Sequence, residues 1–322
     1  MSTSVDAAVD HAEDAAAGGS RRRRPKEPTF AGERSVLSTN DRRRPGVRIG
    51  LRVLVVVVVG GLLLISGGPL LWLFKSAVST SQDIIREPFG LWPSGIQWQN
   101  LSDAWNLVHI GRALLNTVWI ALGSWFFGLL VALTGGYALS VLRPKYGPII
   151  TGAVLATLFV PGVVSLVASY LIILDVPVVE RNLINTFWAV WLPAAPSAFN
   201  VLLMKRVFDR LPRDLFEAAK VDGAGPYRIF WSIVLPMSKP IIGVISLLTI
   251  MAAWKEFLWP MLVLPDPTLQ PLSVVLPRLE QTSEMSLLMA SLFISVIIPV
   301  LLFLVFQRQF LRGAGQAGAL KG

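Results

Sequence analysis

Long, mainly apolar runs alternate with short polar and charged segments along most of the sequence. A helix rises about 1.5 Å per residue, so about 20 apolar residues cross the roughly 30 Å hydrocarbon core of a bilayer. The pattern therefore predicts an all-α integral membrane protein with six transmembrane helices. The six predicted spans cover residues 53–74, 113–142, 146–174, 182–204, 240–264 and 285–307.

The segments outside these spans complete the predicted organisation. Residues 1–47 are rich in Ala, Gly, Ser, Arg and Pro and poor in large apolar side chains, which predicts a disordered basic tail. Residues 48–312 would form the six-helix domain, and residues 313–322 a short C-terminal tail. The arginines of the first tail would anchor the first span, and binding of anionic lipid is the alternative role.

The distribution of Lys and Arg gives an independent test of this topology. With both termini in the cytoplasm, 23 of the 29 Lys and Arg residues lie inside, five lie outside and Lys255 lies within the fifth span. Cytoplasmic loops of membrane proteins carry such an excess of cations. The sequence therefore predicts a multi-pass protein of the bacterial cell membrane with cytoplasmic termini. Topology also accounts for the net charge of +9 better than binding to nucleic acid does.

The composition leaves few groups for chemistry by this chain. It contains no cysteine, and its two histidines are His11 and His109, which excludes thiolate catalysis and sites built from Cys and His. No G-x-x-x-x-G-K-[S/T] sequence is present to hold nucleotide phosphates. We predict no catalytic residue, no metal site and no cofactor bound by this chain.

A charged segment, "LPRDLFEAAKVDGAGPYRIFWSIVLP" at 211–236, separates the fourth and fifth apolar runs. Its first half predicts a short helix opened by Pro212, with Asp214 and Glu217 near the N-terminus, where the helix dipole favours negative charge. Asp222 and Gly223 would end it. One side of this helix would be apolar, with small residues that permit close approach of another surface: Leu211, Leu215, Ala218 and Ala219.

The same segment resembles the cytoplasmic loop of ABC importer permeases. It fits the pattern E-A-A, three residues, Gly, nine residues, I-x-L-P without a gap. In such permeases the loop forms a coupling helix, between the fourth and fifth spans, that docks on a separate ATPase subunit. The alternative is an ordinary amphipathic helix that covers the ends of neighbouring spans. The resemblance assigns the docking contact to Leu215, Glu217, Ala218, Ala219, Asp222 and Gly223.

This resemblance covers about residues 50–322 and implies a set of partners. The chain would form half of a membrane pore with a homologous second permease, two ATPase subunits and an extracytoplasmic solute-binding protein, in contact with membrane lipid and not with nucleic acid. ATP and Mg²⁺ would be used by the partner ATPase. The alternative functions are a secondary transporter or channel, although five of the six predicted spans hold no ionisable residue, and a membrane enzyme.

The C-terminal sequence "QRQFLRGAGQAGALKG" resembles that of carbohydrate-uptake permeases similar to the maltose permease G subunit. The resemblance implies import of a sugar or oligosaccharide, while an anionic solute such as glycerol phosphate stays open. It also implies a second contact with the ATPase, for which a frayed tail is the alternative. The residues of that contact would be Gly318, Ala319, Leu320, Lys321 and Gly322.

The segment "WKEFLWP" at 254–260 resembles the family pattern W-N-E-F-L-W-P, with lysine in place of asparagine. An ionisable side chain within a span is costly and marks a functional candidate, and tryptophan stacks on sugar faces. Alternatively, Lys255 pairs with Glu256 or extends to the outer interface, and the tryptophans form an aromatic belt. The predicted solute path comprises Asn200, Trp254, Lys255, Glu256 and Trp259.

Overall fold

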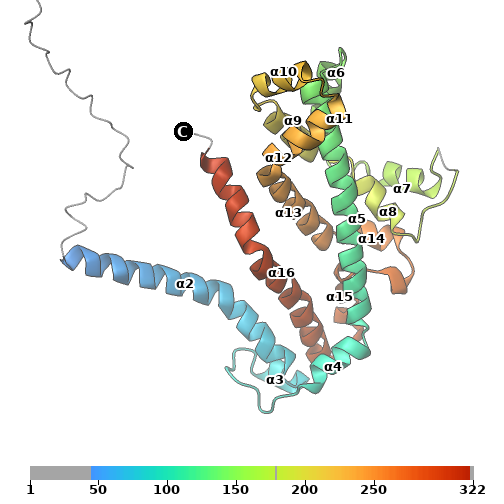
Figure 1. Cartoon of the computed structure of the whole chain (residues 1–322). Helices are drawn as coiled ribbons and strands as arrows, with labels where there is room; N and C mark the ends of the chain where they lie inside the picture. Colours follow the sequence, from blue (N-terminus) through green and yellow to red (C-terminus); the bar gives the residue numbers. More distant parts are fainter. Residues whose placement is uncertain (1–44, 178–179, 320–322) are drawn as a thin grey trace, which may run out of the picture. The chain divides into compact units, whose positions relative to one another are not determined.

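The computed structural model describes residues 45–177 and 180–319, and it is mainly helical, as predicted (Figure 1). Within these ranges no β-strand occurs, and the one β-bridge joins Val176 to Arg181. The chain divides into two parts after Leu64. Residues 45–64 belong to helix α2 (Pro45–Ala77), whose remaining residues begin the second part. The candidate site lies in the second part.

Helix α5 (Ile110–Tyr137) is the central element of this second part, and a π-helical turn, η2 (Ala138–Leu142), continues it. It packs against α8 (Trp188–Ala194), α9 (Ala198–Phe208) and α13 (Lys239–Lys255), and also against α4 (Gln99–Asn106) and α15 (Leu272–Thr282) (Figure 1). A glycine permits the closest of these approaches, because a methyl group at Gly123 would overlap the indole of Trp191.

Three of the predicted spans, at 146–174, 182–204 and 240–264, are interrupted in the structure. Helices α6 (Gly147–Thr157) and α7 (Leu166–Leu174) flank a break at Pro161, and α8 and α9 flank a break at Pro196. Helix α13 ends at Lys255, before α14 (Leu258–Val263). Proline removes a backbone donor and disfavours helical geometry in the residue before it, so the first two breaks follow from sequence.

By length and hydropathy, two described helices could each cross a membrane, Pro45–Ala77 and Ile110–Leu142. A third candidate is a pair of helical segments, Pro226–Met237 and Lys239–Lys255, bent by 79° where they meet. The first predicted span lies within α2 and the second within α5 and η2. The count of six crossings stays a prediction.

The remaining helices follow the predicted order. Helix α3 (Ser81–Arg86) precedes α4, and α16 (Met285–Ala319) extends beyond the predicted end of the last span at 307. Between α9 and α13 lie four short segments, and a 3-10 turn precedes α15 (Figure 1). These are α10 (Arg213–Val221), α11 (Pro226–Ile229), the π turn η3 (Phe230–Val234), α12 (Leu235–Met237) and η4 (Pro267–Leu269).

Candidate functional site

Helix α10 forms where the sequence predicts it and has defined ends. Pro212 precedes its first residue, and Asp214 lies in its first turn, where negative charge is favourable. At the other end, Gly223 has φ +74°, a left-handed conformation that glycine adopts without strain. The amide of Gly223 donates to the carbonyl of Lys220 at 3.0 Å, and that of Ala224 donates to Ala219 at 2.8 Å. This pair of bonds is a Schellman motif, which fixes the end of the helix.

Phe216 anchors α10 to the rest of the domain. Its side chain is only 5% exposed and belongs to a cluster of buried apolar residues, against which Leu211 and Ala219 also pack. Leu215, predicted on the apolar side, is instead 41% exposed. The prediction missed Phe216, although its spacing of three residues from Ala219 places both on one helix face. The rest of the cluster comes from α5, α9, α11, η3 and α13: Ala132, Tyr137, Met204, Phe208, Ile229, Val234 and Ile245.

The opposite side of α10 consists of exposed residues. Val221 is 88% exposed, and Leu215, Glu217 and Ala218 are also exposed. Of the residues assigned to ATPase docking, only Ala219 is partly buried, and Asp222 and Gly223 extend the exposed set. The helix therefore buries one side in its own domain and leaves apolar and acidic side chains accessible on the other.

Tyr137 joins α5 to the segment that follows α10. Its hydroxyl donates to the carbonyl of Pro226 at 2.8 Å, and its ring packs against Phe230 with the ring centroids 4.9 Å apart. Tyr137 is the last residue before η2, and Phe230 is the first residue of η3. Two π-helical turns thus meet at this contact. π turns inside helices are rare and occur frequently at functional sites.

A cavity of about 480 Å³ lies between α5, α8, α9, α13 and α14. Three of the residues predicted for the solute path line it: Asn200, Glu256 and Trp259. The indole of Trp259 donates to the carbonyl of Ala189 at 2.9 Å, which fixes the ring orientation. The carboxylate of Glu256 accepts a bond of 3.2 Å from the backbone amide of Trp259. The remaining lining is mainly apolar.

Two polar groups in this cavity differ in how they are satisfied. The Asn200 amide is buried and donates to the Thr249 hydroxyl at 3.2 Å. The Ser124 hydroxyl is also buried, and it has no hydrogen-bond partner within the part of the chain that the structure describes. Buried polar groups normally have partners, so an unsatisfied one in a cavity calls for a specific explanation.

Residues 124–314 match the family model described as "Binding-protein-dependent transport system inner membrane component". The matched stretch contains α10 and most of the cavity lining. The chain belongs to this family. It is accordingly a membrane permease component of an ABC import system, which works with a binding protein, ATPase and permease partners.

Curated relatives agree with this assignment to the permease family. The sn-glycerol-3-phosphate transport system permease protein UgpE of Yersinia pestis bv. Antiqua (strain Antiqua) is 29% identical over 269 residues, which cover 80% of this chain and 93% of the relative. UgpE of Agrobacterium fabrum (strain C58 / ATCC 33970) is 27% identical over 281 residues, with 84% and 96% covered.

A solved structure, a bacterial ABC transporter involved in the import of the acidic polysaccharide alginate, contains a chain of the same fold. The TM-score is 0.70 at 22% sequence identity, and the match covers 83% of this permease and 98% of that chain. This likeness supports the fold.

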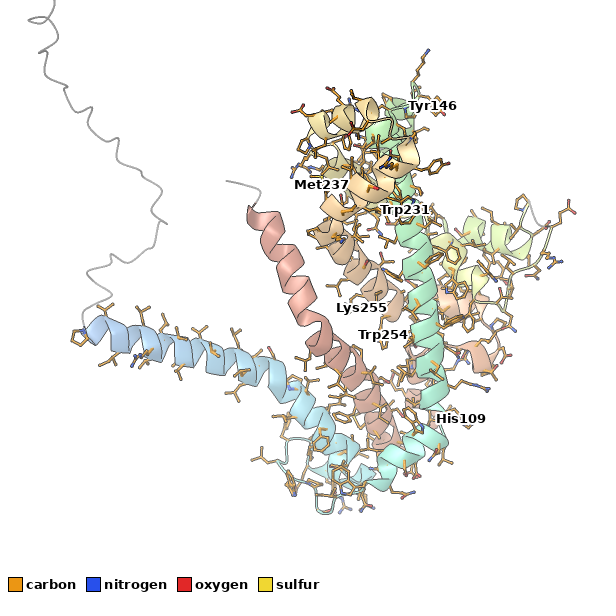
Figure 2. The ribbon with its side chains drawn as sticks, viewed as in Figure 1. His109, Tyr146, Trp231, Met237, Trp254 and Lys255 are labelled. Atoms are coloured by element: carbon orange, nitrogen blue, oxygen red, sulfur yellow. The ribbon has the colours of Figure 1, made fainter. Side chains whose placement is uncertain are left out.

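Two predicted path residues of the permease do not line the cavity. Trp254 packs against the cluster of Ile110, Ala113 and Leu272, and Lys255 is the exposed last residue of α13 (Figure 2). Within the described ranges Lys255 forms no ion pair with Glu256. The end of α13, and not the middle of a continuous span, therefore presents the lysine.

The predicted second contact with the ATPase falls at the limit of the described residues. Gly318 and Ala319 belong to the last turn of α16, and Leu320, Lys321 and Gly322 lie outside the described residues. This contact stays a prediction.

Proposed function

We propose that this permease forms half of the translocation pathway of an importer with one homologous permease, two ATPase subunits and an extracytoplasmic solute-binding protein. Six crossings with both termini in the cytoplasm would place α10 on the side of the ATPase. ATP and Mg²⁺ would act in the partner subunits, because the sequence has no phosphate-binding loop of the G-x-x-x-x-G-K-[S/T] type.

The proposed coupling element is α10. The main support for this proposal is that one side of the helix is buried in its own domain and the other side is exposed. Phe216 holds the helix in its domain, while Leu215, Glu217 and Ala218 remain accessible to another chain. Closure of the ATPase pair would then displace α10, and the contact between Tyr137 and Phe230 would pass this displacement to α5. Such a change is a shift between two states that nucleotide biases.

Single cysteines test this proposal directly, because the natural chain contains none. We expect Ala218→Cys, labelled with a maleimide photocrosslinker, to cross-link to a co-purifying ATPase subunit. The matched control is Ser102→Cys, at an exposed position of α4 that the proposed topology places outside the cell. Cross-linking of both variants to the ATPase, or of neither, would contradict the assignment.

We propose that the cavity lies on the solute path and that the solute is a sugar or oligosaccharide. Hydrogen bonds are offered by Asn200, by Glu256 and by the hydroxyl of Ser124, which has no partner among the described residues, and Trp259 offers an aromatic surface. Hydroxyl-rich solutes use both kinds of contact. The names of the relatives concern glycerol phosphate and alginate, which are both anionic, so an acidic carbohydrate is the second candidate.

Stimulation of ATPase activity separates these solutes. The reconstituted complex, with its binding protein, would be assayed with a neutral disaccharide, an acidic oligosaccharide and sn-glycerol-3-phosphate. We expect at least one of the two carbohydrates to stimulate hydrolysis. Stimulation by glycerol phosphate alone would overturn the proposed solute class, and transport without any ATPase partner would favour a secondary transporter.

A further inference from the structure

A second cavity, of about 620 Å³, lies away from the solute cavity at the junction of η2, α6 and α9. Its wall combines the turn after η2 with the first residues of α6 and the last turn of α9. The lining carries three basic side chains, from Arg143, Lys145 and Lys205, and one acidic side chain, from Asp209.

The charges in this cavity do not cancel. Lys205 is paired with Asp209 at 2.7 Å, so Arg143 and Lys145 provide the excess positive charge. Partial burial opposes ionisation of Asp209, but hydrogen bonds from Lys205 and Ser140, with the charges of Lys205 and Arg143, lower its pKa. Asp209 therefore stays charged at neutral pH and remains occupied with Lys205.

Arg143 is held in position by the backbone around it. Its φ is +49°, and its Nε donates to the carbonyl of Ser140 at 2.9 Å. Its two terminal nitrogens make no hydrogen bond to any residue that the structure describes. A guanidinium whose two terminal nitrogens are both available can donate a pair of parallel hydrogen bonds to the oxygens of a phosphate.

Exposed apolar side chains adjoin the cavity in the sequence. Tyr146 is 62% exposed (Figure 2). Ile149 is 76% exposed, and the two residues follow Lys145 and Pro148 of the lining in the sequence. A free phosphate needs no apolar surface beside its site. A phospholipid does, because its acyl chains must lie against protein or other lipids.

We propose that this cavity, named here the basic cavity, binds the headgroup phosphate of an anionic phospholipid through Arg143 and Lys145. The inference rests on the proposed topology, which puts the turn at 143–147 at the cytoplasmic membrane surface. Anionic lipids in that leaflet are attracted by clustered basic residues, and basic pockets between helices bind their headgroups. The bound lipid would tie η2 to the end of α9, directly before the segment that leads into α10.

Lipid retention by the purified, detergent-solubilised chain with its co-purifying partners tests this proposal. Native mass spectrometry would compare retention of phosphatidylglycerol and phosphatidylcholine. We expect the wild type to prefer phosphatidylglycerol, and we expect this preference to be about thirtyfold weaker in R143Q/K145Q, since each cation near the surface strengthens binding of anionic lipid about fivefold.

The matched control is R206Q/R210Q, which removes two cations from the same end of α9 without touching the cavity lining. It should keep the lipid preference. Equal loss in both double variants, or none in R143Q/K145Q, would overturn the proposal. Displacement of the lipid by inorganic phosphate at equal concentration would also overturn it, because a small-anion site would then be indicated.

The same preparation separates this proposal from the proposed function. Co-purification of the ATPase reports on coupling, whereas lipid preference reports on the basic cavity. Loss of the ATPase with retained phosphatidylglycerol preference would contradict the proposed function and support the lipid site.

Discussion

Helix α10 and the cavity between α5, α8, α9, α13 and α14 are built in opposite ways within one domain. An apolar side chain and a closed set of backbone bonds hold α10, through Phe216 and the turn at Gly223. The cavity is instead bordered by polar groups: the Asn200 amide, which bonds to Thr249, and the Ser124 hydroxyl, which has no partner in the described part of the chain. One region is closely packed with its helix end bonded, and the other contains a buried hydroxyl that has no partner among the described residues.

This difference fits two tasks. A helix that transmits force must move as a body, and close packing of its anchor prevents it from yielding locally. A path that admits a hydrated solute must exchange hydrogen bonds without a large penalty at any step. Substitutions in the first region should therefore stop transport, whereas those in the second should alter it by degrees.

The largest effect is expected for Phe216→Ala. Removal of a buried phenyl group lowers the free energy of unfolding by about 3–5 kcal/mol. Helix α10 should therefore detach from its domain, and the complex should lose both uptake and thermal stability. Thermal unfolding of the purified complex and uptake by cells would be measured together. Leu215→Ala is the control: it should weaken ATPase co-purification while leaving the unfolding temperature near that of the wild type. If both variants had the same unfolding temperature and the same uptake, the proposed difference between the buried anchor Phe216 and the exposed Leu215 would be contradicted.

Glu217→Ala and Gly223→Pro should abolish uptake while the amount of protein in the membrane stays unchanged. Glu217 is exposed on the side of α10 that we propose docks on the ATPase, and proline cannot adopt the positive φ of Gly223. Uptake assays and quantification of the membrane fraction would check this. Normal uptake in both variants would refute the coupling role of α10.

A smaller effect is expected for Asn200→Ala. Loss of its bond to Thr249 leaves that hydroxyl to reorganise in the cavity, and one buried hydrogen bond is worth about 1 kcal/mol. We expect the solute concentration for half-maximal uptake to shift about fivefold, with normal ATPase co-purification. Thr134→Val, on an exposed position of α5 outside the cavity, is the control. Complete loss of transport in Asn200→Ala would contradict the expectation that substitutions in the cavity change transport only by degrees.

The smallest effect concerns pH. Because the pKa of Asp209 is lowered from its ordinary 3.8, ionised Asp209 contributes stability above that pH, and the contribution is lost as pH falls through the lowered value. Asp209→Asn should therefore lower the unfolding temperature slightly at pH 7, by an amount typical of a partly exposed ion pair. The difference should vanish in acid. A difference that grows on acidification would contradict the assigned direction.

The sequence predicted local features whose causes are local. The ends of α10 follow from Pro212 and Gly223, and the breaks near Pro161 and Pro196 follow from the prolines at those positions. The family signature lies in one unbroken stretch of sequence, and the match to the family model confirms the predicted family. Each of these depends on residues a few positions apart.

Features that depend on tertiary packing were not predictable in the same way. The burial of Phe216 requires α5 and α9 beside it, and the contact of Tyr137 with Pro226 joins residues far apart in the chain. The interruption after Lys255 was also not predicted from the sequence, because the nearest proline, Pro260, lies inside the following helix. The sequence placed Lys255 inside a continuous fifth span, but α13 ends at this residue.

The bend between α12 and α13 has a consequence for the surrounding bilayer. If α13 crosses the bilayer as predicted, its 17 residues rise about 25 Å, short of a hydrocarbon core about 30 Å thick, and the segment that departs at 79° cannot make up the difference at that end. Such hydrophobic mismatch is relieved by local thinning of the membrane and by long end residues that reach the interface. Lys255 at the end of α13 is suited to that position, and the transporter should favour lipids with short acyl chains over lipids with long ones.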